Sequence, residues 1–205
     1  MESLTALGSA VGSLLKERKQ TLAIAESSAG GLINAALVAV PGASAYYLGG
    51  GIVYTGAGRS ALLGLTAQDM ANIRSASEPF AKLLAQRVRD NLGATWGLSE
   101  TGASGPSGNR YGDAPGHACI AVCGPVAAVI TIETGSADRE ANMWAFARRA
   151  VELLESCLRK AANARSRMCL ARAIAIGSEA TIARTRTSVR FVPEGRNRLS
   201  IRGSS

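Results

Sequence analysis

Residues Val40–Arg59 read VPGASAYYLGGGIVYTGAGR, a stretch in which turn-forming residues alternate with short apolar runs. A Pro-Gly turn precedes Ser44 and two tyrosines, and three consecutive glycines, Gly49 to Gly51, interrupt a β-type run. Glycine permits positive φ and lets another backbone or a ligand come close. We therefore expect other glycine- and hydroxyl-rich loops to gather around this segment.

The preceding residues predict a strand, a glycine loop and a helix. Residues 21–25 form a short apolar run of the kind found in buried strands, and residues 26–31 follow with two serines and two glycines. Residues 32–40 favour a helix that ends before Pro41. This order directs free backbone N–H groups at an anion. The pattern alone is weak, because any α/β unit needs a tight turn here.

The remainder of the first 160 residues alternates in the same way. Helical periodicity covers 4–19, 79–92 and 138–158, and strand patterns cover 51–54, 94–98, 117–123 and 126–131. The last two strands read as a hairpin, and Ser75 with Glu78 forms a capping-box pattern. The sequence predicts an α/β fold over residues 1–160, a three-layer α/β/α sandwich with a mixed sheet.

A long polar loop, residues 99–112, follows the strand at 94–98 and holds four glycines. Open α/β sheets bind ligands beyond the carboxyl ends of their strands, so this loop indicates a binding function. His117 stands at the start of the next strand. A single histidine there is typical of a structural residue, although a catalytic role stays open.

The net charge of +8 belongs to the end of the chain. Residues 1–160 hold 14 Lys/Arg and 13 Asp/Glu, whereas residues 161–205 hold nine arginines and two acids. The charge therefore does not indicate nucleic-acid binding by the main domain, and leaves only weak binding through the tail. We expect 161–205 to be a poorly ordered Arg-rich tail. A helix continuing to about Ala175 and a hairpin around Pro193 are the alternatives.

Composition disfavours several other classes of protein. No apolar run approaches the roughly 18 residues of a membrane span, and the first residues lack the cationic start of a secretory signal. The four cysteines form no CxxC pair, and His117 is the only histidine, so we expect neither a metal nor a cofactor. Buried cysteines of this kind suit a reduced, cytoplasmic protein.

Three segments together resemble one family. They are Ala25–Gly31 (AESSAGG), Val40–Tyr54 and Glu100–Pro106 (ETGASGP). In order and spacing they are similar to the C-terminal domain of the competence/damage-inducible protein CinA, the nicotinamide-nucleotide amidase family. The resemblance covers about residues 5–158 and leads us to expect a stand-alone, divergent form.

The resemblance implies hydrolysis of the carboxamide of nicotinamide mononucleotide, giving nicotinate mononucleotide and ammonia, by a homodimer in pyridine-nucleotide salvage. That reaction requires a nucleophile, a base and donors for an oxyanion. Ser44 matches the family's nucleophilic serine, and the other implied catalytic positions are Tyr54, Arg59 and Thr101. The implied substrate-binding positions are Ser27, Ser28, Gly30, Gly31, Gly50, Gly102, Ala103, Gly105 and Arg139.

Two positions depart from the family pattern. The family pairs its serine with a lysine fifteen residues later, and this chain has Arg59 there. A guanidinium cannot act as a general base near neutral pH, although it can bind phosphate or stabilise an oxyanion. A second family arginine is Met143 here. Two hypotheses follow: an amidase with a substitute base, or a nucleotide-binding module or amidase of another substrate that keeps the pocket without the dyad.

Overall fold

The structure is a computed structural model that describes the backbone of residues 3–186 and the side chains of residues 3–164. Its centre is a five-stranded sheet in the order β2-β1-β3-β4-β5. The strands are β1 (Leu22–Glu26), β2 (Tyr47–Ile52), β3 (Trp96–Ala103), β4 (His117–Cys123) and β5 (Ala128–Glu133). β1, β2 and β3 are parallel, whereas β4 and β5 form an antiparallel hairpin beside them. The predicted mixed sheet is confirmed.

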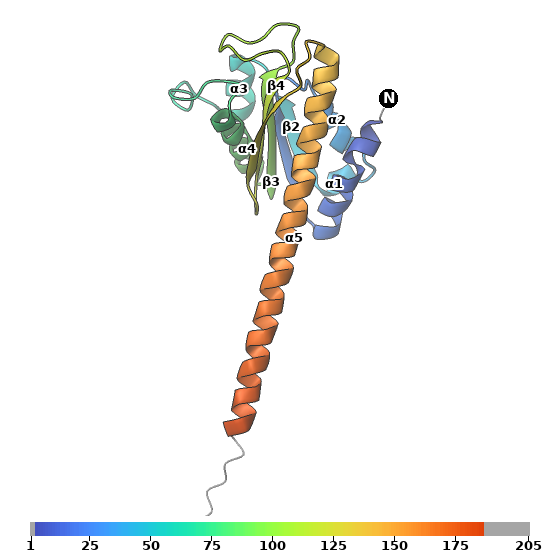
Figure 1. Cartoon of the computed structure of the whole chain (residues 1–205), viewed down its shortest axis with the longest axis vertical. Helices are drawn as coiled ribbons and strands as arrows, with labels where there is room; N and C mark the ends of the chain where they lie inside the picture. The colour runs from blue at the N-terminus through green and yellow to red at the C-terminus, as the bar shows by residue number, and fades with distance from the viewer. Residues whose placement is uncertain (1–2, 187–205) are drawn as a thin grey trace, which may run out of the picture. The chain divides into compact units, whose positions relative to one another are not determined.

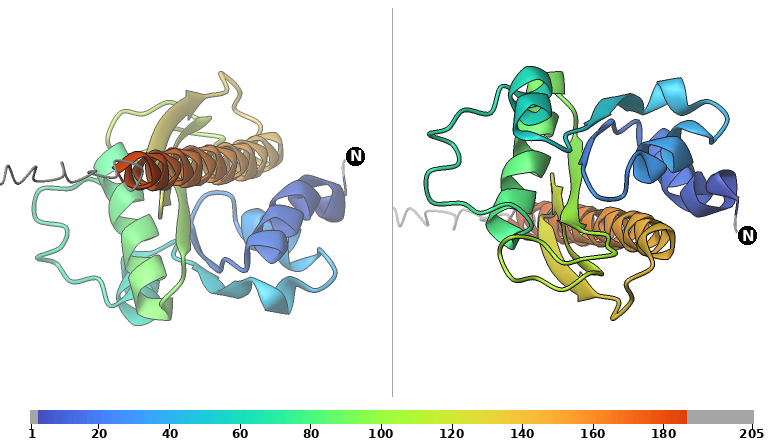
Figure 2. Two further views of the ribbon diagram at one scale, coloured as in Figure 1. Left: turned by 90° about the horizontal axis from the view of Figure 1, so that it is seen from below. Right: turned by 90° about the horizontal axis from the view of Figure 1, so that it is seen from above.

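Helices cover both faces of the sheet (Figures 1 and 2). The helices are α1 (Leu4–Arg18), α2 (Leu32–Val38), α3 (Gly56–Leu63), α4 (Glu78–Leu92) and α5 (Arg139–Arg186). α1, α2 and the first turns of α5 enclose one core with the sheet, centred on buried residues such as Leu15, Ile24 and Phe146. α3 and α4 enclose a second core on the other face, around Phe80 and Leu84. This is the predicted three-layer sandwich.

The chain divides into two units, residues 1–163 and 164–205. Within the second unit the backbone continues as α-helix to Arg186, beyond the Ala175 suggested by the sequence pattern. The hairpin considered around Pro193 lies outside the described residues, so the assignment of a tail from residue 161 stays a prediction.

The start of α4 differs from the sequence expectation. Ser77, and not Ser75, caps this helix, and its hydroxyl accepts a hydrogen bond from the Phe80 amide at 3.4 Å. Pro79 occupies the first turn, where a missing N–H costs nothing. The predicted capping box is therefore wrong by two residues. The Ser75 hydroxyl instead faces Arg59, whose Nη1 donates to it at 2.9 Å.

The parallel strands give the sheet two distinct edges. At the carboxyl edge β1, β2 and β3 end, and at the amino edge they begin. Adjacent strands lie about 4.8 Å apart, so three neighbouring strand ends fall within roughly 10 Å of one another. Loops that follow these strands therefore meet, and loops that precede them meet at the other edge.

Packing, and not a ligand, explains the central glycine of the triple-glycine run. A Cβ at Gly50 would lie 2.6 Å from the Ile24 carbonyl oxygen and would collide with the Asn34 side-chain oxygen. α2 therefore approaches β2 closely only because residue 50 has no side chain. Gly50 also lines a smaller pocket together with Gly49 and Gly51, so its contact with substrate stays a prediction.

We expect Gly50→Ala to destabilise the protein by about 1–3 kcal/mol through overpacking. Gly56→Ala is the matched control, because a Cβ at Gly56 meets nothing within 4 Å. Chemical denaturation of both variants measures the difference. Equal stabilities would show that α2 can move away from β2 without cost.

Candidate functional site

Most of the predicted site residues gather at the carboxyl edge. The loop after β1 supplies residues 27–31, the segment after β2 supplies Tyr54 and Arg59, and the end of β3 supplies residues 101–105. Arg139 begins α5 at the same edge. Segments far apart in the sequence thus lie at one edge of the sheet. Three of them follow parallel strands that end there, and α5 begins there.

Ser44 does not join them. It lies in a 3₁₀ turn, Ala43–Ala45, directly before β2, and its side chain is exposed at the amino edge. The six residues of β2 place roughly 20 Å between this turn and Tyr54. The expectation that Ser44 shares one cleft with Thr101 is wrong for a single chain, because α2 carries the chain back to the amino edge before β2 begins.

Arg139 bridges two of the other predicted residues. Its Nη1 donates to the Gly105 carbonyl oxygen at 2.7 Å, and its Nη2 donates to the Tyr54 hydroxyl at 3.1 Å. The loop after β3, the segment after β2 and the start of α5 are therefore tied together. The contacts leave a permanent positive charge exposed at the carboxyl edge.

Arg59 lines a pocket of about 530 Å³ on the α4 side of this edge. Its guanidinium lies 5.0 Å from the centre of the Phe80 ring and bonds Ser75, and its Nε donates to the Thr55 carbonyl oxygen. The other polar lining residues are Ser60, Thr66, Ser75 and Tyr111. A fixed guanidinium among hydroxyls suits a phosphate group.

Two backbone donors of the loop after β1, the amides of Ser27 and Ala29, are already in use. Glu100 on β3 accepts hydrogen bonds from the Ser27 amide at 3.1 Å, from the Ala29 amide at 2.8 Å and from the Ser28 hydroxyl. Glu26 accepts from the amides of Ile33 and Asn34, both at 3.1 Å. The expected anion site at this strand–loop–helix turn is therefore filled by the protein's own carboxyl groups.

Both carboxyl groups are fully buried, and their pKa values are raised. Burial is the main cause, because it disfavours the charged form. The surrounding donors oppose it in each case, and the pKa of Glu100 still rises to about 7, with a contribution from the neighbouring Glu26. Glu100 therefore changes protonation state near neutral pH.

The hydroxyl groups at this edge differ in their availability. Ser27 is half-buried, and its hydroxyl makes no hydrogen bond to the described residues. Ser28 is buried and bonded to Glu100, and Thr101 is only 3% exposed. The buried Ser104 hydroxyl likewise has no partner among the described residues. Of the hydroxyls on the loop after β1, Ser27 alone is both accessible and free to react.

Most glycines of the β3 loop are required by packing. A Cβ at Gly102 would lie 2.8 Å from Cα of Ala118, and one at Gly105 would lie 2.6 Å from the Ala137 carbonyl oxygen. Ala103 pairs with His117 in the sheet. These residues shape the carboxyl edge, and nothing in their contacts identifies them as ligand groups.

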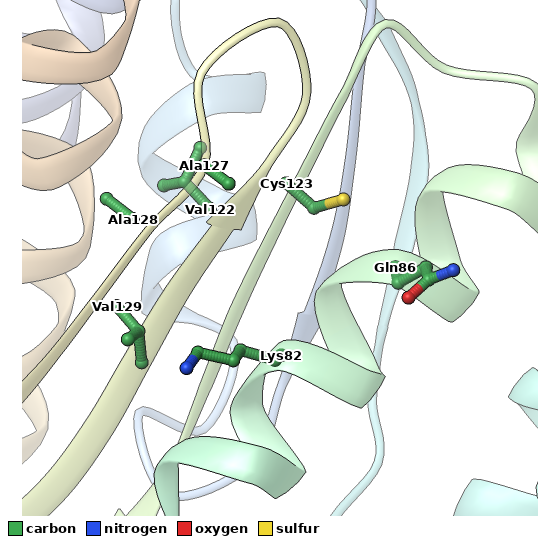
Figure 3. Close-up of a pocket in the computed structure, with 7 residues that line it drawn as sticks. All are labelled: Lys82, Gln86, Val122, Cys123, Ala127, Ala128 and Val129. Atoms are coloured by element: carbon green, nitrogen blue, oxygen red, sulfur yellow. The ribbon is translucent and has the colours of Figure 1, made fainter.

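A second large pocket, of about 520 Å³, contains none of the predicted residues (Figure 3). It lies between α4 and the β4–β5 hairpin, towards the turn that joins the two strands. Its polar lining groups are Lys82, Gln86 and Cys123, and the Cys123 sulfur accepts a hydrogen bond from Arg89 at 3.1 Å. Its position separates it from the carboxyl-edge groups.

Comparison with known proteins identifies the family. The CinA C-terminal domain matches residues 4–158 of this chain. The chain belongs to the CinA C-terminal domain family. A CinA-like protein of Synechococcus elongatus is 34% identical over 157 residues, which are 77% of this chain and 37% of that protein. One from Gloeothece citriformis is 40% identical over 119 residues, which are 58% of this chain and 28% of that protein.

Solved structures agree on the fold of this CinA domain. A CinA superfamily protein of Klebsiella pneumoniae superposes with a TM-score of 0.72 at 24% identity, covering 78% of this chain and 99% of the other. One from Escherichia coli gives 0.69 at 24% identity, covering 75% and 90%. The chain spans only about a third of the curated relatives it matches, so the likeness establishes family and fold.

None of the helices within residues 3–186 is long and apolar enough to cross a membrane. Within the described side chains, no group of three or more His, Cys, Asp or Glu residues is arranged to hold a metal ion.

Sequence reasoning missed Glu100, Ser75 and Tyr111. Glu100 had a detectable signal, since an acid within a strand as buried as β3 needs an internal partner. Ser75 was assigned to a helix cap, and Tyr111 lies in a loop whose path the sequence does not specify. These two residues line the pocket beside Arg59 because the fold brings their loops next to α3.

His117 has a structural role. Its Nδ1 lies 2.5 Å from a Glu133 carboxylate oxygen, and its Nε2 lies 3.0 Å from the Ala76 carbonyl oxygen. Burial acts to lower the pKa of His117, but Glu133, the Ala76 carbonyl and Asp113 together outweigh it, so the pKa is raised. The imidazole therefore joins the end of β5 to the backbone just before α4.

This pKa shift predicts a pH-dependent stability. A histidine with a raised pKa stabilises the fold fully below its ordinary value of about 6.5, and that contribution is lost as the pH rises through the folded pKa. We expect the difference in melting temperature between wild type and His117→Gln to be larger at pH 5.5 than at pH 8.5. Glu133→Gln should reduce this pH dependence. A difference that does not vary with pH would exclude an ionic role.

Proposed function

We propose that this CinA domain hydrolyses the carboxamide of nicotinamide mononucleotide to nicotinate mononucleotide and ammonia. Family membership supports the class of reaction. The observation that carries the proposal is the grouping of an accessible serine hydroxyl and two exposed or half-exposed arginines, Arg59 and Arg139, at one edge of the sheet. A substrate with an amide at one end and a phosphate at the other suits such a grouping.

Ser27 is the nucleophile in this proposal, in place of Ser44. Its Oγ attacks the carboxamide carbon, the C–N bond breaks, and the hydroxyl proton leaves with ammonia. Water then hydrolyses the resulting ester and restores the serine. Ser27 follows β1 directly, with neighbouring parallel strands on both sides, so groups from the ends of β2 and β3 lie within reach of a substrate there.

The arginines take binding roles. Arg59 cannot accept the serine proton, since a guanidinium is not a general base near neutral pH, but its charge and its pocket suit the phosphate. Arg139 holds the Tyr54 hydroxyl beside the loop after β3. Tyr54 is exposed, which leaves its ring available to the ribose or the pyridine. Dimerisation and a place in pyridine-nucleotide salvage belong to the same proposal.

Alanine variants of the two serines separate the candidate nucleophiles. We expect Ser27→Ala to reduce ammonia release from nicotinamide mononucleotide by roughly 10³-fold or more, because no other group then attacks the amide. Ser44→Ala should retain activity, since its side chain lies at the amino edge. Both variants are assayed at matched folded concentration. Activity lost in Ser44→Ala and kept in Ser27→Ala would return the nucleophile to Ser44.

A phosphate role for Arg59 predicts a loss that depends on the substrate. Arg59→Ala should raise KM for nicotinamide mononucleotide by about 10- to 100-fold, the usual value of one charge-assisted hydrogen bond. Nicotinamide riboside, which lacks the phosphate, is the matched control and should be affected little. Equal losses for both substrates would contradict phosphate binding by Arg59.

The loss of the family lysine keeps a second candidate in view, a nucleotide-binding module without turnover. Calorimetry of wild type with nicotinamide mononucleotide distinguishes the two. Binding without ammonia release, together with turnover gained in Arg59→Lys, would support the module and refute the amidase proposal.

A further inference from the structure

Glu100 makes an unusual connection between two parallel strands. It lies on β3 one residue beyond the last pair with β1, Ala25 with Ser99. Its side chain is completely buried and turns to the loop that follows β1. There one carboxyl oxygen accepts the amides of Ser27 and Ala29, and the other accepts the Ser28 hydroxyl. One side chain therefore holds three consecutive residues of the loop.

Among the described residues, Glu26 is the acid that acts on Glu100. Glu26, at the end of β1, raises the pKa of Glu100 through its negative charge. It also caps α2 by accepting hydrogen bonds from the amides of Ile33 and Asn34. On the other side, β4 presents Ile120 as its sheet partner, which carries no charge. The loop between β1 and α2 contributes only amides and hydroxyls. Among the described side chains, these three donors and not a cation balance the charge on Glu100.

We propose that Glu100 is a positioning residue for Ser27, whose ionised carboxylate fastens the loop after β1 so that the Ser27 hydroxyl is presented at the carboxyl edge. The inference rests on the proposed function and deepens it, since it supplies a control of the nucleophile that neither Arg59 nor the family resemblance provides. Glu100 acts through the backbone of Ser27 and needs no contact with substrate.

The two protonation states of Glu100 hold the loop differently. The carboxylate accepts all three donors in charge-assisted hydrogen bonds, which are the stronger kind. The protonated acid carries a hydrogen on one oxygen, so it must turn a donor towards the loop, and the Ser28 hydroxyl has to reorient. Because the pKa of Glu100 is about 7, both states are populated in neutral solution.

Activity and stability should therefore respond to pH in opposite directions. With an inactive protonated state, kcat rises about tenfold between pH 6 and pH 8, as a pKa near 7 requires. The raised pKa of an acid has the reverse effect on folding. The native state keeps a proton that the unfolded chain has released, so stability falls as the pH rises from about 4.3 through 7.

Glu100→Gln is the principal test. The amide oxygen of glutamine can accept both backbone N–H groups, and its NH₂ can donate to the Ser28 hydroxyl, so the loop stays connected but no longer titrates. In this variant we expect kcat for nicotinamide mononucleotide to lose its rise with pH near 7 (the limb of the pH profile), with KM changed little. The same limb retained in Glu100→Gln would overturn the proposal.

Ser28→Ala provides a second variant that moves the limb instead of removing it. The Ser28 hydroxyl lowers the pKa of Glu100, so its loss should shift the limb to higher pH. A role of Ser28 in packing alone would reduce activity equally at every pH. An unchanged midpoint in Ser28→Ala would contradict the assignment of the limb to Glu100.

Hydrogen exchange of the loop amides tests the positioning without any turnover. After correction for the intrinsic pH dependence, protection of the Ser27 and Ala29 amides should increase through pH 7 in wild type and stay level in Glu100→Gln. If protection of these amides increases through pH 7 but no ammonia is released, the proposed function fails and the positioning role of Glu100 stands. If ammonia is released and protection does not increase through pH 7, the positioning role of Glu100 fails and the proposed function stands.

Discussion

The common direction of β1, β2 and β3 is the constraint on which the candidate site depends. A parallel strand must be followed by a segment that returns the chain to the start of the next strand. Whatever follows such a strand therefore lies at one edge of the sheet, and whatever precedes it lies at the other. Ser27 and Tyr54 lie at the same edge for this reason, and Ser44 lies at the opposite edge for the same reason.

The fold itself was accessible to sequence reasoning because its signals are local. Apolar periodicity located α4 and the buried part of α5. In the hairpin, β4 covers the predicted residues and β5 begins and ends two residues later than predicted. The cap of α4 was misplaced because Ser75 and Ser77 are both residues of a type that caps helices, and Ser75, which has Glu78 three residues later, fits the capping-box pattern better although Ser77 is the cap. Local rules assign an element well and its first residue poorly.

The site was less accessible, because spacing in a motif does not show on which edge a residue lies. Fifteen residues separate Ser44 from Arg59, and a strand lies between them. Strand direction alone contradicts a cis pairing of these two residues, and the sequence pattern already contained that information. Glu100 raised a different difficulty, since its partners are amides 71 to 73 residues away, which only the folded sheet reveals.

Buried carboxyl groups in this domain do what a bound anion does in other glycine loops. A strand–loop–helix turn exposes backbone N–H groups that attract negative charge, and here Glu26 and Glu100 satisfy them internally. The turn is thereby ordered before any substrate arrives, at the cost of burying two acids whose pKa values rise. The phosphate of the proposed substrate then needs a positive partner elsewhere, and we assign that role to Arg59 beside its hydroxyl-lined pocket. Arg59, which cannot act as a general base near neutral pH, thus fits an edge where Glu100 already occupies the Ser27 and Ala29 amides of the loop after β1.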